Sequence, residues 1–213
     1  MSSVRVTTAG LIALLVAIGS AVPASAHRLD EYLQALRVDL RADGIVLELD
    51  LTPGAHLAAD LVATLDANAD RAIDVAEADA YVASVLRSLE LSVDDHRVGL
   101  DLISRTIPSM DEVREGSGVI SLVARADVDQ PSGRHRVRVS NGFRPDVGAY
   151  LANALRPDSR AITIASQLRD SRQQTLTIDY VVSAPLAARR LGWTTIAVLL
   201  IGGCGWWRRQ QRS

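Results

Sequence analysis

The segment LRVDLRADGIVLELDLTPG, residues 36–54, decides the fold class of this chain. Apolar and polar residues alternate on both sides of a short turn at 42–44. A period of two is that of a strand with one buried face, and turn residues between two such runs indicate a hairpin. The segment therefore predicts an antiparallel β-hairpin that ends at Thr52-Pro53-Gly54. The alternating apolar positions are Leu36, Val38 and Leu40 before the turn and Leu47, Leu49 and Leu51 after it.

Shorter alternating segments, separated by turn residues, continue along the chain. Together with the hairpin they give eight predicted strands, which is typical of a β-sandwich. Residues 148–155 fit either a helix or a strand, and 108–118 form a polar excursion. The predicted fold is mainly β with an α insertion (α+β): a β-sandwich domain over 27–185, with a helix-loop-helix inserted at 56–89. The six later strands are predicted at 91–93, 98–102, 119–128, 134–140, 161–165 and 175–182.

The insertion contains the twelve-residue stretch DANADRAIDVAE, residues 66–77. Its oxygen-bearing side chains stand at positions 1, 3, 5, 9 and 12, which is the spacing of an EF-hand calcium loop. Calcium takes six to eight oxygen ligands, and position 7 of such a loop supplies a backbone carbonyl. The sequence therefore predicts a calcium site. Its ligands would be the side chains of Asp66, Asn68, Asp70, Asp74 and Glu77 and the carbonyl of Ala72.

The residues around this loop support the interpretation with one exception. Apolar residues recur at helical spacing before and after the loop, from Leu57 to Leu65 and from Tyr81 to Leu89, and Ile73 stands at the apolar position 8. Position 6, however, is Arg71 rather than the usual Gly. A non-Gly residue in a left-handed conformation costs about 1–2 kcal/mol, so affinity should fall about tenfold. We expect weak binding, or, alternatively, a helical hairpin that binds no ion.

Both ends of the chain carry predicted targeting segments. Residues 1–26 have one early Arg, an apolar run and Ala24-Ser25-Ala26, which predicts a secretory signal peptide. Residues 191–207 are uncharged and have Arg pairs on both sides, so 189–213 are predicted to form a transmembrane helix with a short basic tail. The domain would then lie outside the cytoplasm, anchored in the cell membrane. A sorting tail removed after export is the alternative.

The composition narrows the function further. All 23 basic residues are Arg, and outside the terminal segments 17 of them face 25 Asp and Glu, a formal charge near −8. Such a domain should repel nucleic acid and anionic lipid. The single cysteine, Cys204, lies in the predicted membrane helix, so the domain has no disulfide. No nucleophile, zinc-protease or phosphate-loop motif is present, and we therefore predict no enzyme activity.

His27 would be the first residue after signal cleavage. Its imidazole and the new α-amine could together chelate nickel or copper, which makes a transition-metal accessory domain one alternative function. The histidines at 56, 96 and 135 show no zinc-type spacing, and His135 reads as a strand residue on a solvated face. A structural or adhesive domain that binds no ion is the other alternative.

Several motifs resemble a bacterial family. They are the predicted mature start HRLDEYLQ (27–34), the strand end LDLTPG (49–54), the calcium-type loop, and the stretch from GRHR (133–136) through RPD (144–146) to YLANAL (150–155). They resemble exported EF-hand domain proteins related to the ectodomains of urease- and hydrogenase-associated nickel permeases. The resemblance implies an extracytoplasmic, β-rich domain with one calcium-type hand. It also implies association with a metal permease or another envelope protein. With a single apolar helix after the domain, the chain itself would not be the transporter.

Overall fold

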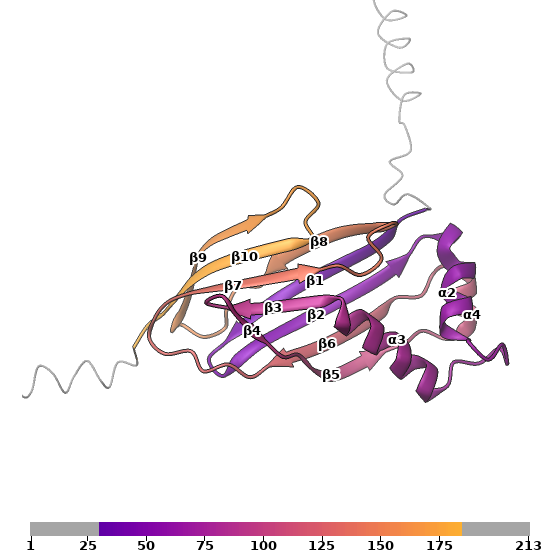
Figure 1. The fold of residues 1–213 in the computed structure, drawn as a ribbon, viewed down its shortest axis with the longest axis horizontal. Helices are drawn as coiled ribbons and strands as arrows, with labels where there is room; N and C mark the ends of the chain where they lie inside the picture. Colours follow the sequence, from indigo (N-terminus) through magenta and orange to yellow (C-terminus); the bar gives the residue numbers. More distant parts are fainter. Residues whose placement is uncertain (1–29, 185–213) are drawn as a thin grey trace, which may run out of the picture.

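The computed structural model describes residues 30–184 of the 213-residue chain, and this part is mainly β. Ten strands form two five-stranded sheets, in the orders β5-β6-β2-β1-β8 and β4-β3-β7-β10-β9 (Figure 1). The first sheet consists of β1 (Tyr32–Arg41), β2 (Gly44–Pro53), β5 (Asp101–Thr106), β6 (Ile120–Ala126) and β8 (Gly148–Ala154). The second consists of β3 (Leu89–Val93), β4 (His96–Val98), β7 (Gly133–Asn141), β9 (Ile162–Arg169) and β10 (Thr175–Val182).

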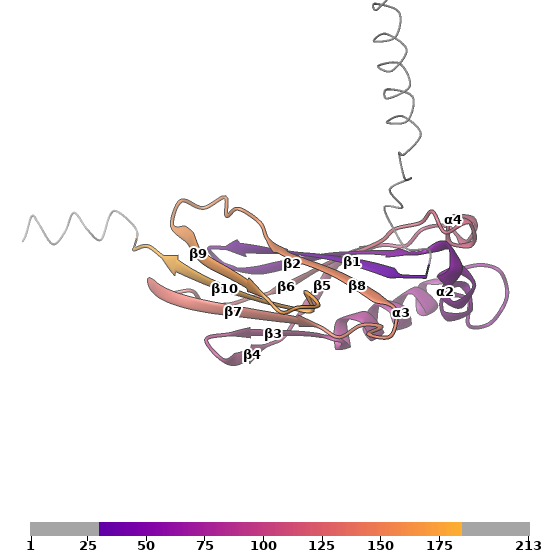
Figure 2. The same cartoon turned by 90° about the horizontal axis from the view of Figure 1, so that it is seen from above.

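The two sheets lie one over the other and share one hydrophobic core (Figure 2). Val38 and Leu40 of the first sheet and Val139 and Ile178 of the second are fully buried in the same cluster. Strands such as β6 and β10 alternate buried and partly exposed residues, as expected when one face of each sheet covers the core. The mainly β prediction is therefore confirmed.

The predicted hairpin at 36–54 is present as β1 and β2. Their register pairs Leu36 with Leu49 and Arg41 with Gly44, which leaves a two-residue turn. The ambiguous segment 148–155 forms β8, which pairs in parallel with β1, whereas every other strand pair is antiparallel. A parallel neighbour distant in sequence leaves no local signal, which explains the ambiguity.

Two predictions between residues 98 and 118 were wrong. The single strand expected at 98–102 is divided: β4 ends at Val98 in one sheet, and β5 begins at Asp101 in the other. The polar excursion contains a helix, α4 (Met110–Glu115), with a capping box between Ser109 and Glu112 and a left-handed Gly116 at its C-terminal end. Ser-x-x-Glu followed by Gly is a helix signature that the polarity of the segment hides.

The helices predicted around loop 66–77 are present between β2 and β3. They are η1 (Ala55–Leu57), α2 (Ala58–Leu65) and α3 (Val75–Arg87), and they gather with α4 toward the end of the molecule opposite the end of β10 (Figure 1). Leu89, expected in the second helix, instead begins β3. No helix among residues 30–184 is long and apolar enough to cross a membrane. The predicted signal peptide (1–26) and membrane helix (189–213) lie outside the described residues.

Aromatic residues fix α3 to the first sheet. The hydroxyls of Tyr32 in β1 and Tyr81 in α3 form a 2.5 Å hydrogen bond, and the Tyr81 ring meets Phe143 edge-on, with centroids 5.9 Å apart. Burial raises the pKa of Tyr32 to about 12 and also raises that of Tyr81, so both stay neutral hydrogen-bonding groups. The helix that closes the candidate loop is therefore held firmly on the core.

Candidate metal centre

Loop 66–77 lies between two helices whose ends set its geometry. Asp66 is the C-cap of α2, and its N–H donates to the carbonyl of Val62 over 2.8 Å. Asp74 is the N-cap of α3, which begins at Val75. A helix thus ends immediately before position 1 of the loop, and the next begins at position 10. This is the helix-loop-helix arrangement that the sequence predicted.

Short side chains curl the first half of the loop by accepting bonds from its own backbone. Asn68 Oδ1 accepts from the N–H of Asp70, and Asp70 Oδ1 accepts from the N–H of Ala72, both over 2.9 Å. Such Asx turns let Asn and Asp close tight loops. Asp66 Oδ2 accepts from the N–H of Arg71 over 3.0 Å. Positions 1, 3 and 5 therefore surround a common turn.

Arg71 takes the left-handed backbone that position 6 of a calcium loop requires. Its φ is +71°, and Ala69 also has a positive φ of +58°. Side chains with a Cβ are strained in this region, at about 1–2 kcal/mol. The Arg71 side chain is exposed, so its volume causes no clash and only the backbone strain remains.

Glu77 joins the two halves of the loop. Its Oε2 accepts from the N–H of Asp74 over 3.1 Å, and Asp74 Oδ1 accepts in return from the N–H of Glu77 over 2.8 Å, which makes a capping box. Its other oxygen, Oε1, accepts from the N–H of Asn68 over 3.2 Å. The Glu77 carboxylate, at position 12, therefore reaches position 3 across the loop. Both of its oxygens already accept hydrogen bonds from backbone N–H groups.

Asp66 has a buried carboxylate oxygen without a hydrogen-bond partner among the described residues. The residue is only 8% exposed, and the unpaired atom is Oδ1. A buried, unpaired carboxylate oxygen is costly, so native structures usually satisfy such atoms with a donor, a water or an ion. The other oxygen of this carboxylate accepts from the N–H of Arg71 within the loop. A cation bound in the loop would therefore lie close to Oδ1. The donors are hard oxygens, which suits calcium.

The loop is not arranged for full coordination. Within residues 30–184, no three His, Cys, Asp or Glu side chains lie close enough together to hold a metal ion. Glu77 would have to give up its bonds to Asn68 and Asp74 before its carboxylate could act as a bidentate ligand. The six predicted positions are thus gathered in one loop, but ion binding requires Glu77 to move, which lowers affinity.

The exit side of the loop is tied to the first sheet. Arg105 in β5 forms an ion pair with Asp79, and it also donates to the carbonyl of Val75 over 3.5 Å. Ile73, at position 8, is partly buried and packs against the shared core. The sequence left the packing partner of Ile73 open, and the structure places it against the body of the domain.

A second cluster surrounds His135 in β7. The side chain is about 10% exposed, contrary to the solvated position expected from sequence. Nδ1 lies 2.7 Å from Asp94 Oδ2, and Nε2 lies 2.8 Å from the carbonyl of Pro131. Both partners are acceptors, so both ring nitrogens donate when the imidazole is charged. The Asp94 hydrogen bond raises the pKa of His135. No local sequence pattern indicates this pairing, because the partners are 41 residues apart.

Comparisons with protein-family models, with curated proteins and with solved structures find no match to this chain.

Proposed function

We propose that this chain is a membrane-anchored, extracytoplasmic calcium-binding module without catalytic activity. The observation that carries the proposal is the buried, unpaired Oδ1 of Asp66 at position 1 of a loop whose remaining turns follow the calcium-loop pattern. The positive charge of Arg71 and the engaged Glu77 both weaken binding. A dissociation constant of about 10⁻⁴–10⁻³ M, the range of extracellular calcium modules, is expected.

Two parts of the proposal rest on residues outside the described range. The export signal at 1–26 and the anchor at 189–213 are supported by sequence pattern alone. Association with a metal permease or another envelope protein is supported by the family resemblance. In this reading, calcium stabilises the helix-loop-helix by binding only its folded form.

Calorimetric titration of the full chain in a nonionic detergent tests the calcium site. Calcium should bind with one-to-one stoichiometry, and Glu77→Gln should weaken it about tenfold or more, because one charged ligand is worth about 1.5–3 kcal/mol. Asp129→Asn is the matched control, since Asp129 is exposed and its carboxylate makes no hydrogen bond or ion pair with any described residue. Calcium binding that is equal in Glu77→Gln and the control would refute the site.

The same titration separates the alternatives. Nickel or copper binding that disappears when the α-amine is blocked would favour the accessory domain built on His27, which lies outside the described residues. Absence of binding to any of the three ions would favour a structural or adhesive domain with an inert helical hairpin.

A further inference from the structure

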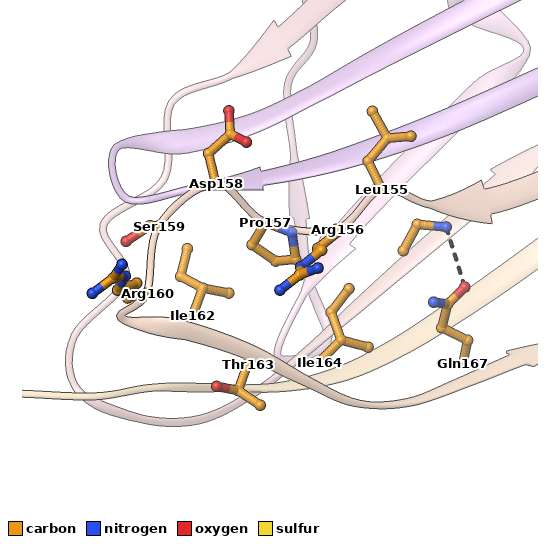
Figure 3. Close-up of a pocket in the computed structure, with 11 residues that line it drawn as sticks. Leu155, Arg156, Pro157, Asp158, Ser159, Arg160, Ile162, Thr163, Ile164 and Gln167 are labelled. Carbon is orange, nitrogen blue, oxygen red and sulfur yellow. Dashed lines mark hydrogen bonds between the residues drawn. The ribbon is translucent and has the colours of Figure 1, made fainter.

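A cleft of about 850 Å³ opens between β8 and β9, the edge strands of the two sheets. Figure 3 shows Ile162, Thr163 and Ile164 of β9 along one side and the connecting segment 155–160 along the other. Ile162 is buried and Ile164 is half-buried, so the β9 side offers apolar surface beside a polar rim. This cleft lies away from the calcium-type loop.

Two arginines on the connecting segment give the cleft its charge. Arg156 and Arg160 are exposed, and neither makes an ion pair or hydrogen bond with any described residue. By contrast, Arg37, Arg125 and Arg136 are each paired with carboxylates. The acid between them does not neutralise them, because the Asp158 side chain points to the opposite side of the segment in Figure 3. Two unpaired guanidinium groups beside apolar surface suit an amphipathic anion.

The cleft lies beside the end of β10. Val182, the last residue of β10, pairs with Ile162, and the N–H of Ser183 donates to the carbonyl of Ala161 over 2.7 Å. Only six residues, 185–190, lie between Ala184 and Leu191, where the predicted membrane helix begins, so these two residues are at most about 25 Å apart. If the chain is anchored as proposed above, the cleft is therefore close to the membrane surface.

The helical end of the domain is acidic. The helical segments 55–88 and 107–118 contain nine Asp and Glu but only three Arg. Tyr32 of β1 contacts α3, whereas Val38, six residues later, pairs with Ala154 beside the cleft. About 20 Å of strand separates these points, which exceeds the Debye length of about 8 Å at physiological salt. The acidic end therefore lies too far from the two arginines to weaken their attraction to an anionic surface.

We propose that this cleft binds the phosphate of an anionic phospholipid headgroup in the membrane that anchors the chain. Arg156 and Arg160 pair with the phosphate oxygens, and Ile162 and Ile164 contact the glycerol and the first acyl carbons. The proposal rests on the anchored arrangement given under the proposed function but not on calcium binding. The two arginines would thus attract an anionic lipid, although the net negative charge of the whole domain is expected to repel one.

Hydrogen exchange of the full chain in lipid nanodiscs tests the proposal. In discs that contain phosphatidylglycerol, amides of 155–164 should exchange more slowly than in discs of phosphatidylcholine alone. The double variant Arg156→Gln/Arg160→Gln should lose this difference. Arg87→Gln/Arg172→Gln, which removes the same charge from exposed arginines elsewhere, should keep it. Equal protection in both lipids, or protection unchanged in the cleft variant, would overturn the proposal.

A second experiment does not depend on insertion of the anchor into a bilayer. The full chain in nonionic detergent is titrated with monomeric dihexanoyl phosphatidylglycerol and, separately, with inorganic phosphate. The short-chain lipid should bind more tightly than phosphate, and the cleft variant should lose that binding. Equal affinity for both would overturn the lipid assignment in favour of a free-phosphate site. Failure of the chain to insert into the discs would refute the anchor alone, and this experiment would then decide the cleft.

Discussion

Replacing Asp66 with Asn should separate calcium binding from folding. Asn keeps one oxygen to accept the bond from the N–H of Arg71, but it removes the charge and the unpaired carboxylate oxygen that a calcium ion would satisfy. Without calcium, the variant should be about as stable as the parent, because the amide NH2 that takes the place of Oδ1 is also unpaired but, unlike the carboxylate, carries no charge to bury.

The calcium-dependent part of the stability has a definite size. With a dissociation constant of about 1 mM, 10 mM calcium stabilises the folded state by about 1.4 kcal/mol. For a domain of this length, that corresponds to a rise in Tm of roughly 3–6 °C. Asp66→Asn should abolish the rise, whereas Asp129→Asn should preserve it.

Thermal unfolding followed by circular dichroism measures this shift. The full chain is melted in detergent with 10 mM calcium chloride or with sodium chloride at equal ionic strength, so that screening alone is subtracted. A calcium shift of the same size in Asp66→Asn as in the parent would refute the placement of the ion at Asp66.

Three further outcomes follow from the structure. Arg71→Gly should raise the free energy of unfolding by about 1–2 kcal/mol even without calcium, because the loop already holds position 6 at φ +71° before an ion binds; an unchanged urea midpoint would contradict this. The Asp94 hydrogen bond raises the pKa of His135 above 6.5. The stability that this bond gives the folded state is therefore complete below pH 6.5 and is lost as pH rises through the folded-state pKa. Urea midpoints between pH 5 and 9 should therefore show a decline that His135→Gln removes, and an identical decline in the variant would count against the pairing. Tyr81→Phe should cost about 1–3 kcal/mol in urea unfolding, because it leaves the buried Tyr32 hydroxyl without its partner; a change below about 0.5 kcal/mol, the usual range for surface positions, would contradict that role.

The parts of the fold that the sequence predicts are those with a local signal. Alternation between Leu36 and Leu51 was enough for the β1–β2 hairpin, since both strands and their turn lie in one segment. The six candidate ligand positions lie within twelve consecutive residues, so a single loop between two helices contains them all. For the same reason, the capping signature from Ser109 to Glu112 was available in the sequence, although the polarity of its segment concealed it.

The parts that sequence reasoning missed depend on distant partners. The chain passes from one sheet to the other between Val98 and Asp101, and no local pattern marks that crossing. His135 is buried by contacts with Asp94 and Pro131 that exist only after β3, β4 and β7 have assembled. The engagement of Glu77 by backbone donors is likewise a property of the folded loop.

A crystal structure of the full chain grown with about 10 mM calcium would show whether loop 66–77 holds an ion. We expect an ion within about 2.3–2.6 Å of Asp66 Oδ1 and of both Glu77 carboxylate oxygens, with the bonds from Glu77 to the N–H groups of Asn68 and Asp74 broken. A loop without an ion, in which Glu77 still caps α3, would contradict it.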